Sequence, residues 1–214
     1  MKAKSLLIAG AALAASLMTS KAQVYSQNIV GYINVPLNQG YNLVANQLDA
    51  DGTGTNNGIY ETIGTNMPNF SKVYAWNGAG YSVATFSATS HTWLGNNLSI
   101  SNSMNPGNGF FLYCPVATNV TLVGNVITGT NTYPIRAGFQ IVAPSGPLAG
   151  TIDTTNGYTP TKLDKIYLWN GSGYTVKTYS GTSWLGGDPQ LTVGQAIFLD
   201  AYGNTNWTQV LNVQ

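Results

Sequence analysis

KVYAWNGAGYSVATFS at residues 72–87 returns with few changes as KIYLWNGSGYTVKTYS at residues 165–180. In both copies, apolar and polar side chains alternate over two short runs rich in Val, Tyr and Thr, which is the pattern of half-buried β-strands. An Asn-Gly pair between the runs favours a tight hairpin, because both residues tolerate positive φ angles. Gly80 and Gly173 then predict a bulge before each outgoing strand. The stretch therefore predicts one β-hairpin in each half of the chain.

The repeat extends in both directions and in the same order. PLNQGYNLVA at 36–45 matches PIRAGFQIVA at 134–143, and the WLG triplet at 93–95 matches the one at 184–186. Strands are expected near 29–37, 41–47, 72–76, 81–86, 109–114 and 120–126, and again near 132–135, 139–143, 165–169, 174–179, 196–201 and 207–213. The pattern predicts an all-β chain of two homologous β-sandwich or small-barrel modules, at 23–127 and 128–214. The join near 127–131 is too short for a free linker, so the modules are expected to pack with pseudo-twofold symmetry.

Several motifs recur along the chain in a fixed order. They are Gly-aromatic-x-Leu/Ile-Val-Ala, then Val/Ile-Tyr-x-Trp-Asn-Gly-x-Gly-Tyr, then PGNGFFL at 106–112 and VTLVG at 120–124. Over residues 29–213 the chain resembles the tandem-repeat β-modules of largely uncharacterised secreted bacterial proteins, of the GWNLIS…YxWNGxGY…PGxGFF type. The resemblance implies a fold and no activity. The second copy departs from it at 192–196, where TVGQA lacks the second glycine and the Phe-Phe pair.

The first 22 residues have the features of a signal peptide. Lys2 and Lys4 precede a short apolar stretch, and small residues follow near Ala22. The apolar stretch is shorter than the ~20 residues that span a bilayer, and no later segment approaches that length. We therefore expect export to the periplasm, the cell surface or the extracellular space, without membrane insertion.

Charge is scarce and slightly negative after the signal peptide. Charged residues make up 7% of the chain, and three of its eight basic residues lie in the first 22, so the remainder carries seven acids and a net charge of −2. Five scattered cations do not make the clustered basic surface that nucleic acids require. The composition indicates a neutral polar surface, typical of a matrix, coat or glycan-facing protein, and excludes a nucleic-acid partner.

The residues that carry catalysis are few. His91 is the only histidine, with Thr182 in its place in the second copy, and Cys114 is the only cysteine, expected to be buried because it lies in an apolar run. The sequence contains no Gly-x-Ser-x-Gly elbow. A glycoside hydrolase needs two facing carboxylates, and the spacing of the seven acids indicates no such pair, which leaves this activity a remote alternative. No catalytic residues are expected.

Asp49 and Asp51 are the candidate metal ligands. They lie two residues apart on a glycine-rich loop, DADGTG at 49–54, where carboxylates and backbone carbonyls could surround a calcium ion. A helix–loop–helix calcium loop would have acids at the positions of Thr53 and Tyr60 instead. The second copy lacks the motif, and a plain acidic turn is the other interpretation.

Aromatic side chains are the remaining candidates for a binding site. Tyr74 and Trp76 alternate onto one face of their strand with Val73 on the other, and the second copy repeats the arrangement. Exposed rings of this kind would bind polysaccharide, whereas buried rings would be cross-strand packing or the core between the copies. The candidate residues are Tyr74, Trp76, Trp93, Tyr167, Trp169 and Trp184.

Two functions remain open from the sequence. A structural or adhesive protein of the cell surface or matrix fits the low charge and the tandem modules, and it would self-associate through the edges of strands 29–37 and 207–213 if these are unpaired. A carbohydrate-binding module is the alternative and uses the aromatic residues.

Overall fold

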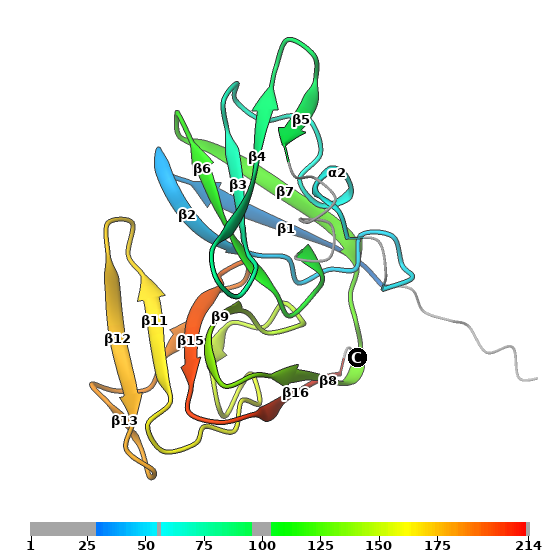
Figure 1. The fold of residues 1–214 in the computed structure, drawn as a ribbon. Coiled ribbons are helices and arrows are strands. Elements are labelled where there is room, and N and C mark those ends of the chain that lie inside the picture. Colours follow the sequence, from blue (N-terminus) through cyan, green and yellow to red (C-terminus); the bar gives the residue numbers. More distant parts are fainter. Residues whose placement is uncertain (1–28, 55–56, 96–103, 213–214) are drawn as a thin grey trace, which may run out of the picture.

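The computed structural model describes residues 29–54, 57–95 and 104–212; the predicted signal peptide lies outside this part of the chain. The regular secondary structure of the described chain is β-strand, apart from α2, a short helix at Ile59–Thr62. Its strands form open antiparallel sheets rather than a closed barrel (Figure 1). The predicted all-β class is confirmed, and the layered sheets are those of a sandwich.

The first module has two layers. One layer is a ribbon in which β1 (Val30–Leu37) pairs antiparallel with β7 (Thr118–Asn125). The other is a five-stranded sheet with the order β2 (Gly40–Ala45), β6 (Gly109–Cys114), β3 (Lys72–Trp76), β4 (Tyr81–Ser87) and β5 (Thr92–Gly95). Alternate residues of both layers, such as Ile33 and Phe110, point between them and form one core.

The second module repeats this arrangement. Its ribbon pairs β8 (Gly129–Ile135) with β16 (Thr205–Leu211). Its sheet has the order β9 (Gly138–Val142), β15 (Ile197–Ala201), β11 (Lys165–Trp169), β12 (Tyr174–Tyr179) and β13 (Trp184–Leu185). A short extra pair joins β10 (Gly150–Thr151) to β14 (Gln190–Leu191). Ile135, Ile166 and Trp207 lie in its core.

The two predicted hairpins are confirmed, but their loops lack the expected bulge. Trp76 pairs directly with Tyr81, so the loop has four residues and the expected bulge is absent. The Asn77 side-chain oxygen accepts a hydrogen bond from the Gly80 amide at 2.8 Å, and the second copy repeats this bond at the same distance. Gly78 has φ of 96°, a backbone conformation that glycine adopts without steric cost, which explains why a glycine occupies this position. The asparagine closes each loop without a bulge, because its side-chain oxygen accepts this bond and its own amide donates to the Gly80 or Gly173 carbonyl at 3.0 Å.

The two modules meet through contacts that recur with the modules exchanged. Trp76 Nε1 donates a hydrogen bond to the Phe139 carbonyl (3.2 Å), and its counterpart Trp169 Nε1 donates one to the Tyr41 carbonyl (2.9 Å). In the same way, the Ala45 amide donates to the Gly194 carbonyl and the Ala143 amide donates to the Gly107 carbonyl, both at 2.9 Å. Phe111 and its counterpart Phe198 pack against each other with ring centroids 6.0 Å apart. This is the pattern that pseudo-twofold packing would produce; the axis itself stays a prediction.

The two strands that could join copies if unpaired each have a partner. β1 is bonded to β7 along its whole length, and β16 is bonded to β8 in the same way. Each ribbon brings the first and last strands of a module together, so one edge of each of these strands is already used. Self-association through them stays a prediction, now limited to the other edge.

Candidate binding face at the module junction

The outer surfaces of the two five-stranded sheets are aromatic. In β3, Val73 and Ala75 point into the core, so Tyr74 and Trp76 point outward, as the alternation predicted. The matching residues of β11, Tyr167 and Trp169, lie outside the second core. Neighbouring strands add further rings at matched positions. We call this set the aromatic face: Tyr41, Tyr74, Trp76, Tyr81, Phe111 and Tyr113 from the first module, and Phe139, Tyr167, Trp169, Tyr174 and Phe198 from the second.

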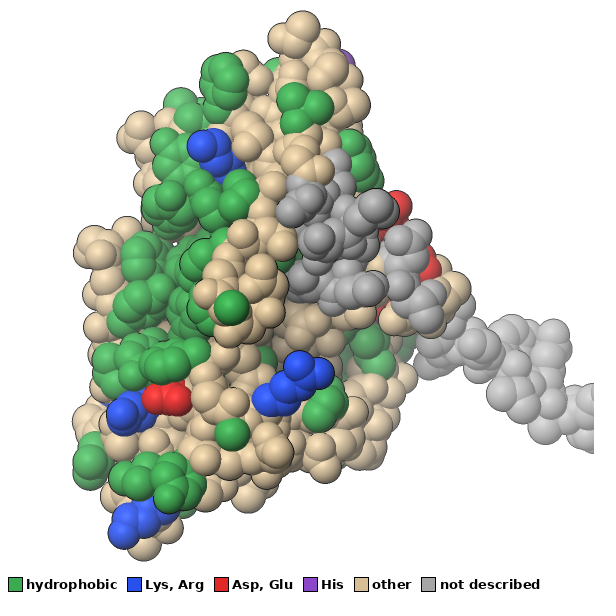
Figure 2. All heavy atoms as spheres, viewed as in Figure 1, with side chains coloured by type: hydrophobic (Ala, Val, Ile, Leu, Met, Phe, Trp, Pro, Cys, Tyr) green, Lys and Arg blue, Asp and Glu red, His purple; other side chains and the backbone are tan. Residues whose placement is uncertain are grey.

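The aromatic face is continuous over both modules. Figure 2 shows hydrophobic side chains gathered over the two sheets, with few charged side chains among them. Ring contacts link the modules directly, since Phe111 packs edge-on against Trp169 at 5.5 Å and Phe198 packs in the same way against Trp76 at 6.1 Å. These edge-to-face contacts hold the rings of the two modules against each other.

Two related pockets lie on the aromatic face. One, of about 320 Å³, is lined by Trp76 and Tyr81 together with four rings of the second module. The other, of about 300 Å³, has Trp169 and Tyr174 together with four rings of the first module. Tyr81 and Tyr174 line both pockets and are 41% and 40% exposed. Each pocket therefore has rings from both modules, and neither module alone completes one.

Trp76 and Trp169 both pack between the modules and line the pockets. Each indole N–H is bonded to a backbone carbonyl of the other module, so each side chain holds the junction together. Each ring also lines one of the two pockets. The tryptophans are thus part of the packing between copies, with one side turned to the pocket.

Trp93 and Trp184 do not belong to the aromatic face. Trp93 is only 2% exposed, packs on Phe86 and donates a hydrogen bond from Nε1 to the Gly64 carbonyl at 2.8 Å. Trp184 is only 4% exposed and packs on Tyr179. Their candidacy as ligand-binding residues is wrong, because buried rings offer no surface to a ligand.

Three tyrosines of the aromatic face, Tyr74, Tyr81 and Tyr174, stay uncharged over the physiological range. Burial first, and then the hydrogen bond shared with Tyr41, raises the pKa of Tyr74 to about 12. Burial also raises the pKa of Tyr174 to about 12 and raises the pKa of Tyr81. Their hydroxyls can therefore donate and accept hydrogen bonds at the rim of the pockets.

A third hollow extends the aromatic face of the first module. It has a volume of about 540 Å³ and is lined by Phe70, Tyr41, Tyr74 and Tyr113, among others. Phe70 has φ of 68° and a side chain that is 65% exposed, although bulky residues rarely adopt this backbone conformation. Leu163, at the matching position before β11, has φ of 79° and lines none of these pockets, so the positive φ belongs to the repeated turn and the exposed ring is what distinguishes Phe70. No local pattern in the sequence indicated this backbone conformation.

The loop of Asp49 and Asp51 uses its carboxylates internally. Asp49 accepts hydrogen bonds from the Gly54 amide at 2.8 Å and from the Asn57 side chain at 3.2 Å. Asp51 accepts from the Thr53 amide at 2.9 Å. Within residues 29–54, 57–95 and 104–212, no three His, Cys, Asp or Glu side chains gather in a way that could hold a metal. The loop is an acidic turn closed by its own donors, and we propose no calcium site there.

The acids do not meet at the aromatic face. All seven belong to the described part of the chain, and none lines the hollows described here. Asp164 is buried, where it accepts hydrogen bonds from the Tyr158 hydroxyl and the Thr161 amide, both at 2.7 Å. His91 is exposed in the turn between β4 and β5. The pockets thus lack the carboxylate pair that a glycoside hydrolase places across its substrate.

Comparisons with protein-family models, with curated proteins and with solved structures found no match for this chain. In the described residues, no helix has the length and apolar character needed to cross a membrane. The resemblance to secreted tandem-repeat β-modules stays a prediction.

Proposed function

We propose that this chain is an exported, non-catalytic adhesive protein that binds polysaccharide of a cell surface or matrix through its aromatic face. The observation that carries the proposal is the pair of related pockets at the module junction, lined by rings from both modules. A concave, mostly apolar site with a few polar groups is the usual form of a ligand site.

The chemistry of the face suits sugars. The flat sides of sugar rings present C–H groups, which pack against aromatic rings, while the hydroxyls at their edges need hydrogen-bond partners. The rings of Tyr81 and Tyr174 provide the packing surface, and their uncharged hydroxyls provide partners. Side-chain amides lie nearby, since Asn77 and Asn170 directly follow the two tryptophans.

The exposed rings of the aromatic face also point to a ligand, since Tyr41, Tyr81, Phe139 and Tyr174 are 40–52% exposed. Contiguous apolar surface of this kind on a soluble protein usually marks an interaction site, because covering it is favourable. A chain with 7% charged residues has little electrostatic repulsion to keep other molecules away. An extended polymer that lies across the two pockets would cover rings of both modules.

The test is retention of the purified protein in native gels that contain soluble polysaccharides, with hydroxyethylcellulose, xylan, galactomannan and methyl-esterified pectin as the panel. We expect retention in at least one gel, and we expect Tyr81→Ala/Tyr174→Ala to weaken binding at least tenfold, as loss of two aromatic anchors does. These tyrosines are preferable to the tryptophans, whose removal would also break hydrogen bonds between the modules.

Tyr32→Ala is the matched control. Tyr32 is an exposed tyrosine of β1 that lines none of the pockets, so its removal should leave retention unchanged. Circular dichroism and thermal unfolding of all variants establish that the fold is intact. Absence of retention in the whole panel, or full retention by the double variant, would overturn the proposal.

A further inference from the structure

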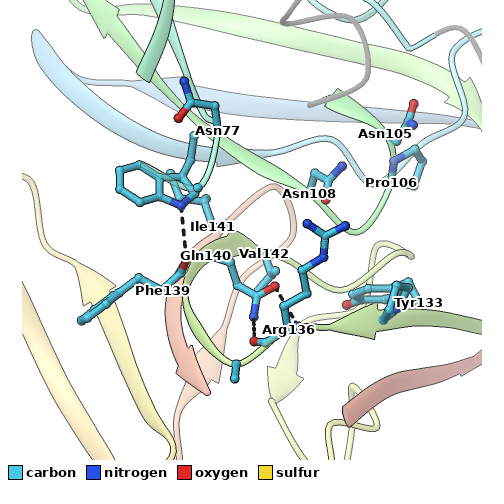
Figure 3. Close-up of a pocket in the computed structure, with 14 residues that line it drawn as sticks. Asn77, Asn105, Pro106, Asn108, Tyr133, Arg136, Phe139, Gln140, Ile141 and Val142 are labelled. Carbon is cyan, nitrogen blue, oxygen red and sulfur yellow. Dashed lines mark hydrogen bonds between the residues drawn. The ribbon is translucent and has the colours of Figure 1, made fainter. Parts of the chain in front are cut away.

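A further hollow lies beside the aromatic face. It has a volume of about 630 Å³ and is lined by residues of both modules (Figure 3). Trp76 and Phe139 line this hollow and also the pocket of about 320 Å³ on the aromatic face, so the two adjoin. A polymer bound on the aromatic face would therefore reach this hollow with a neighbouring sugar. We call it the arginine pocket, after Arg136.

A related hollow exists on the other side of the junction. It has a volume of about 390 Å³ and is lined by the counterparts of the same residues, including Trp169, Asn170 and Tyr41. We call it the asparagine pocket, because Asn38 stands where the arginine pocket has Arg136. Matched residues of the two modules thus form two similar pockets, of which only one contains a charged side chain.

The turns that carry Arg136 and Asn38 have the same internal bonding. The Asn38 carbonyl accepts a hydrogen bond from the Asn42 side chain at 2.9 Å, and the Arg136 carbonyl accepts one from the Gln140 side chain at 2.5 Å. Both turns lead from a ribbon strand into the first strand of a sheet. Because the backbone is locked in the same way, the two side chains can be exchanged without rebuilding the turn.

Arg136 is the only arginine of the chain. Its side chain is exposed and extends towards Asn108 within the pocket, as Figure 3 shows. None of the seven carboxylates lines this pocket, and the remaining polar lining consists of neutral amides such as Asn77 and Gln140. A positive charge among neutral amides attracts an anion, and a planar guanidinium binds a carboxylate or sulfate through two parallel hydrogen bonds.

We propose that the arginine pocket binds an anionic substituent of a polysaccharide, a carboxylate or a sulfate, while the asparagine pocket accepts a neutral sugar. This inference rests on the proposed polysaccharide binding and names its ligand as an acidic polymer. The two pockets lie on either side of the module junction, so the charge difference would also give the bound polymer a preferred direction.

The experiment compares acidic polymers with their neutral counterparts. Polygalacturonate is paired with its methyl ester, and dextran sulfate with dextran, in native gels at about 0.15 M salt, where distant charges are screened. We expect the wild-type protein to bind at least one acidic member about tenfold more tightly than its neutral partner, as a charge-assisted pair would give. Which pair shows the preference distinguishes carboxylate from sulfate recognition.

Three variants locate the preference. Arg136→Asn makes the arginine pocket resemble its counterpart and should abolish the preference while keeping neutral binding. Lys162→Asn removes the same charge from an exposed side chain that lines neither pocket, and it should have no effect. Asn38→Arg should increase the preference for the acidic polymer.

The two proposals fail in different ways. Equal binding of acidic and neutral polymers by the wild-type protein, or an unchanged preference in Arg136→Asn, would overturn the anionic site while leaving polysaccharide binding intact. Equal losses in Arg136→Asn and Lys162→Asn would also overturn it, because net charge would then explain the effect. Binding to none of the four polymers, together with none of the earlier panel, would overturn both proposals.

Discussion

At the scale of single residues, Cys114 shows how burial controls reactivity. Its side chain points from β6 into the core of the first module, as the apolar run predicted, and burial raises its pKa to about 11. Because only the thiolate reacts, this shift alone lowers the reactive fraction about 100-fold at pH 8 relative to an ordinary thiol. We expect no reaction with Ellman's reagent in native buffer and complete reaction in denaturant. Fast native reaction would show that the end of β6 opens.

Phe70 tests whether an exposed ring is kept at a cost to stability. The left-handed backbone conformation costs a bulky residue roughly 1–2 kcal/mol, and asparagine adopts it more readily. We therefore expect Phe70→Asn to raise the free energy of unfolding by about 1 kcal/mol in urea denaturation, while weakening polysaccharide retention, because Phe70 lines a pocket of the aromatic face.

Leu163 is the matched control for this prediction. It has φ of 79°, is exposed, and donates its amide to the Tyr179 carbonyl at 2.9 Å, just as Phe70 donates to the Phe86 carbonyl at 3.0 Å. Leu163→Asn should stabilise the protein similarly and leave retention unchanged. If both variants lose stability, packing of these side chains outweighs the backbone strain.

At the scale of elements, packing at the junction explains why the matched strands β6 and β15 begin differently, with Gly109 before one Phe pair and Ala196 at the corresponding position of the second module. A Cβ placed on Gly109 would lie 2.3 Å from Ala196 Cβ and 2.7 Å from Ile141 Cγ2, so only one of the two facing positions has room for a methyl group. We expect Gly109→Ala to lower the free energy of unfolding by about 1–3 kcal/mol, as overpacking does, measured in urea. Adding Ala196→Gly should restore part of the loss. No rescue would show that Ile141, rather than Ala196, limits the space.

The strands were predictable from sequence where alternation is long enough to read. The runs at 72–76 and 81–86 became β3 and β4, and their outward tyrosines followed from the alternation. β5 and β13 escaped prediction because strands of four and two residues carry almost no periodic signal. β10 and β14 were not predicted either, because they have two residues each and pair across a long stretch of sequence.

The candidate site was only partly predictable, and the reason is register. Trp93 lies opposite Phe86, which points into the core, so Trp93 must point there too. Trp76 lies opposite Tyr81 on the outer side. Which face an aromatic residue occupies thus depends on its cross-strand partner, and this pairing is set by loops that a local pattern does not describe. Tyr81 and Tyr174 were within reach, since the outward alternation of their own strands includes them.

At the scale of the whole molecule, the tyrosines predict loss of stability in alkali. Tyr74 and Tyr174 have pKa values of about 12 in the folded chain, mainly through burial, against about 10 when unfolded. Between these values the unfolded chain has released protons that the folded chain retains, so rising pH favours unfolding. We expect the melting temperature to be flat up to about pH 9 and to fall from pH 10 to 12. A melting temperature that stays constant to pH 12 would contradict the burial of these hydroxyls.

The junction should make the two modules unfold as one unit. Gln47 of the first module is fully buried, donates to the Pro144 and Gly146 carbonyls at 3.3 and 3.1 Å, and accepts from the Gly194 amide at 2.7 Å. Because the pockets and the apolar core at the junction also need both modules, separate unfolding would expose apolar surface on each. Calorimetry of residues 23–214 should therefore show a single transition.

Gln47→Ala tests this coupling at its most buried contact. The substitution leaves buried backbone groups without partners, which costs about 1–3 kcal/mol and lowers the melting temperature. Gln39→Ala removes an amide of the same kind whose hydrogen bond, to the Pro115 carbonyl at 2.9 Å, is exposed, so it should change little. Two resolved transitions in the wild-type protein would show that the modules are independent. In that case the pockets that need rings from both modules would form only while the junction is closed, and ligand binding would itself raise the temperature at which the modules separate.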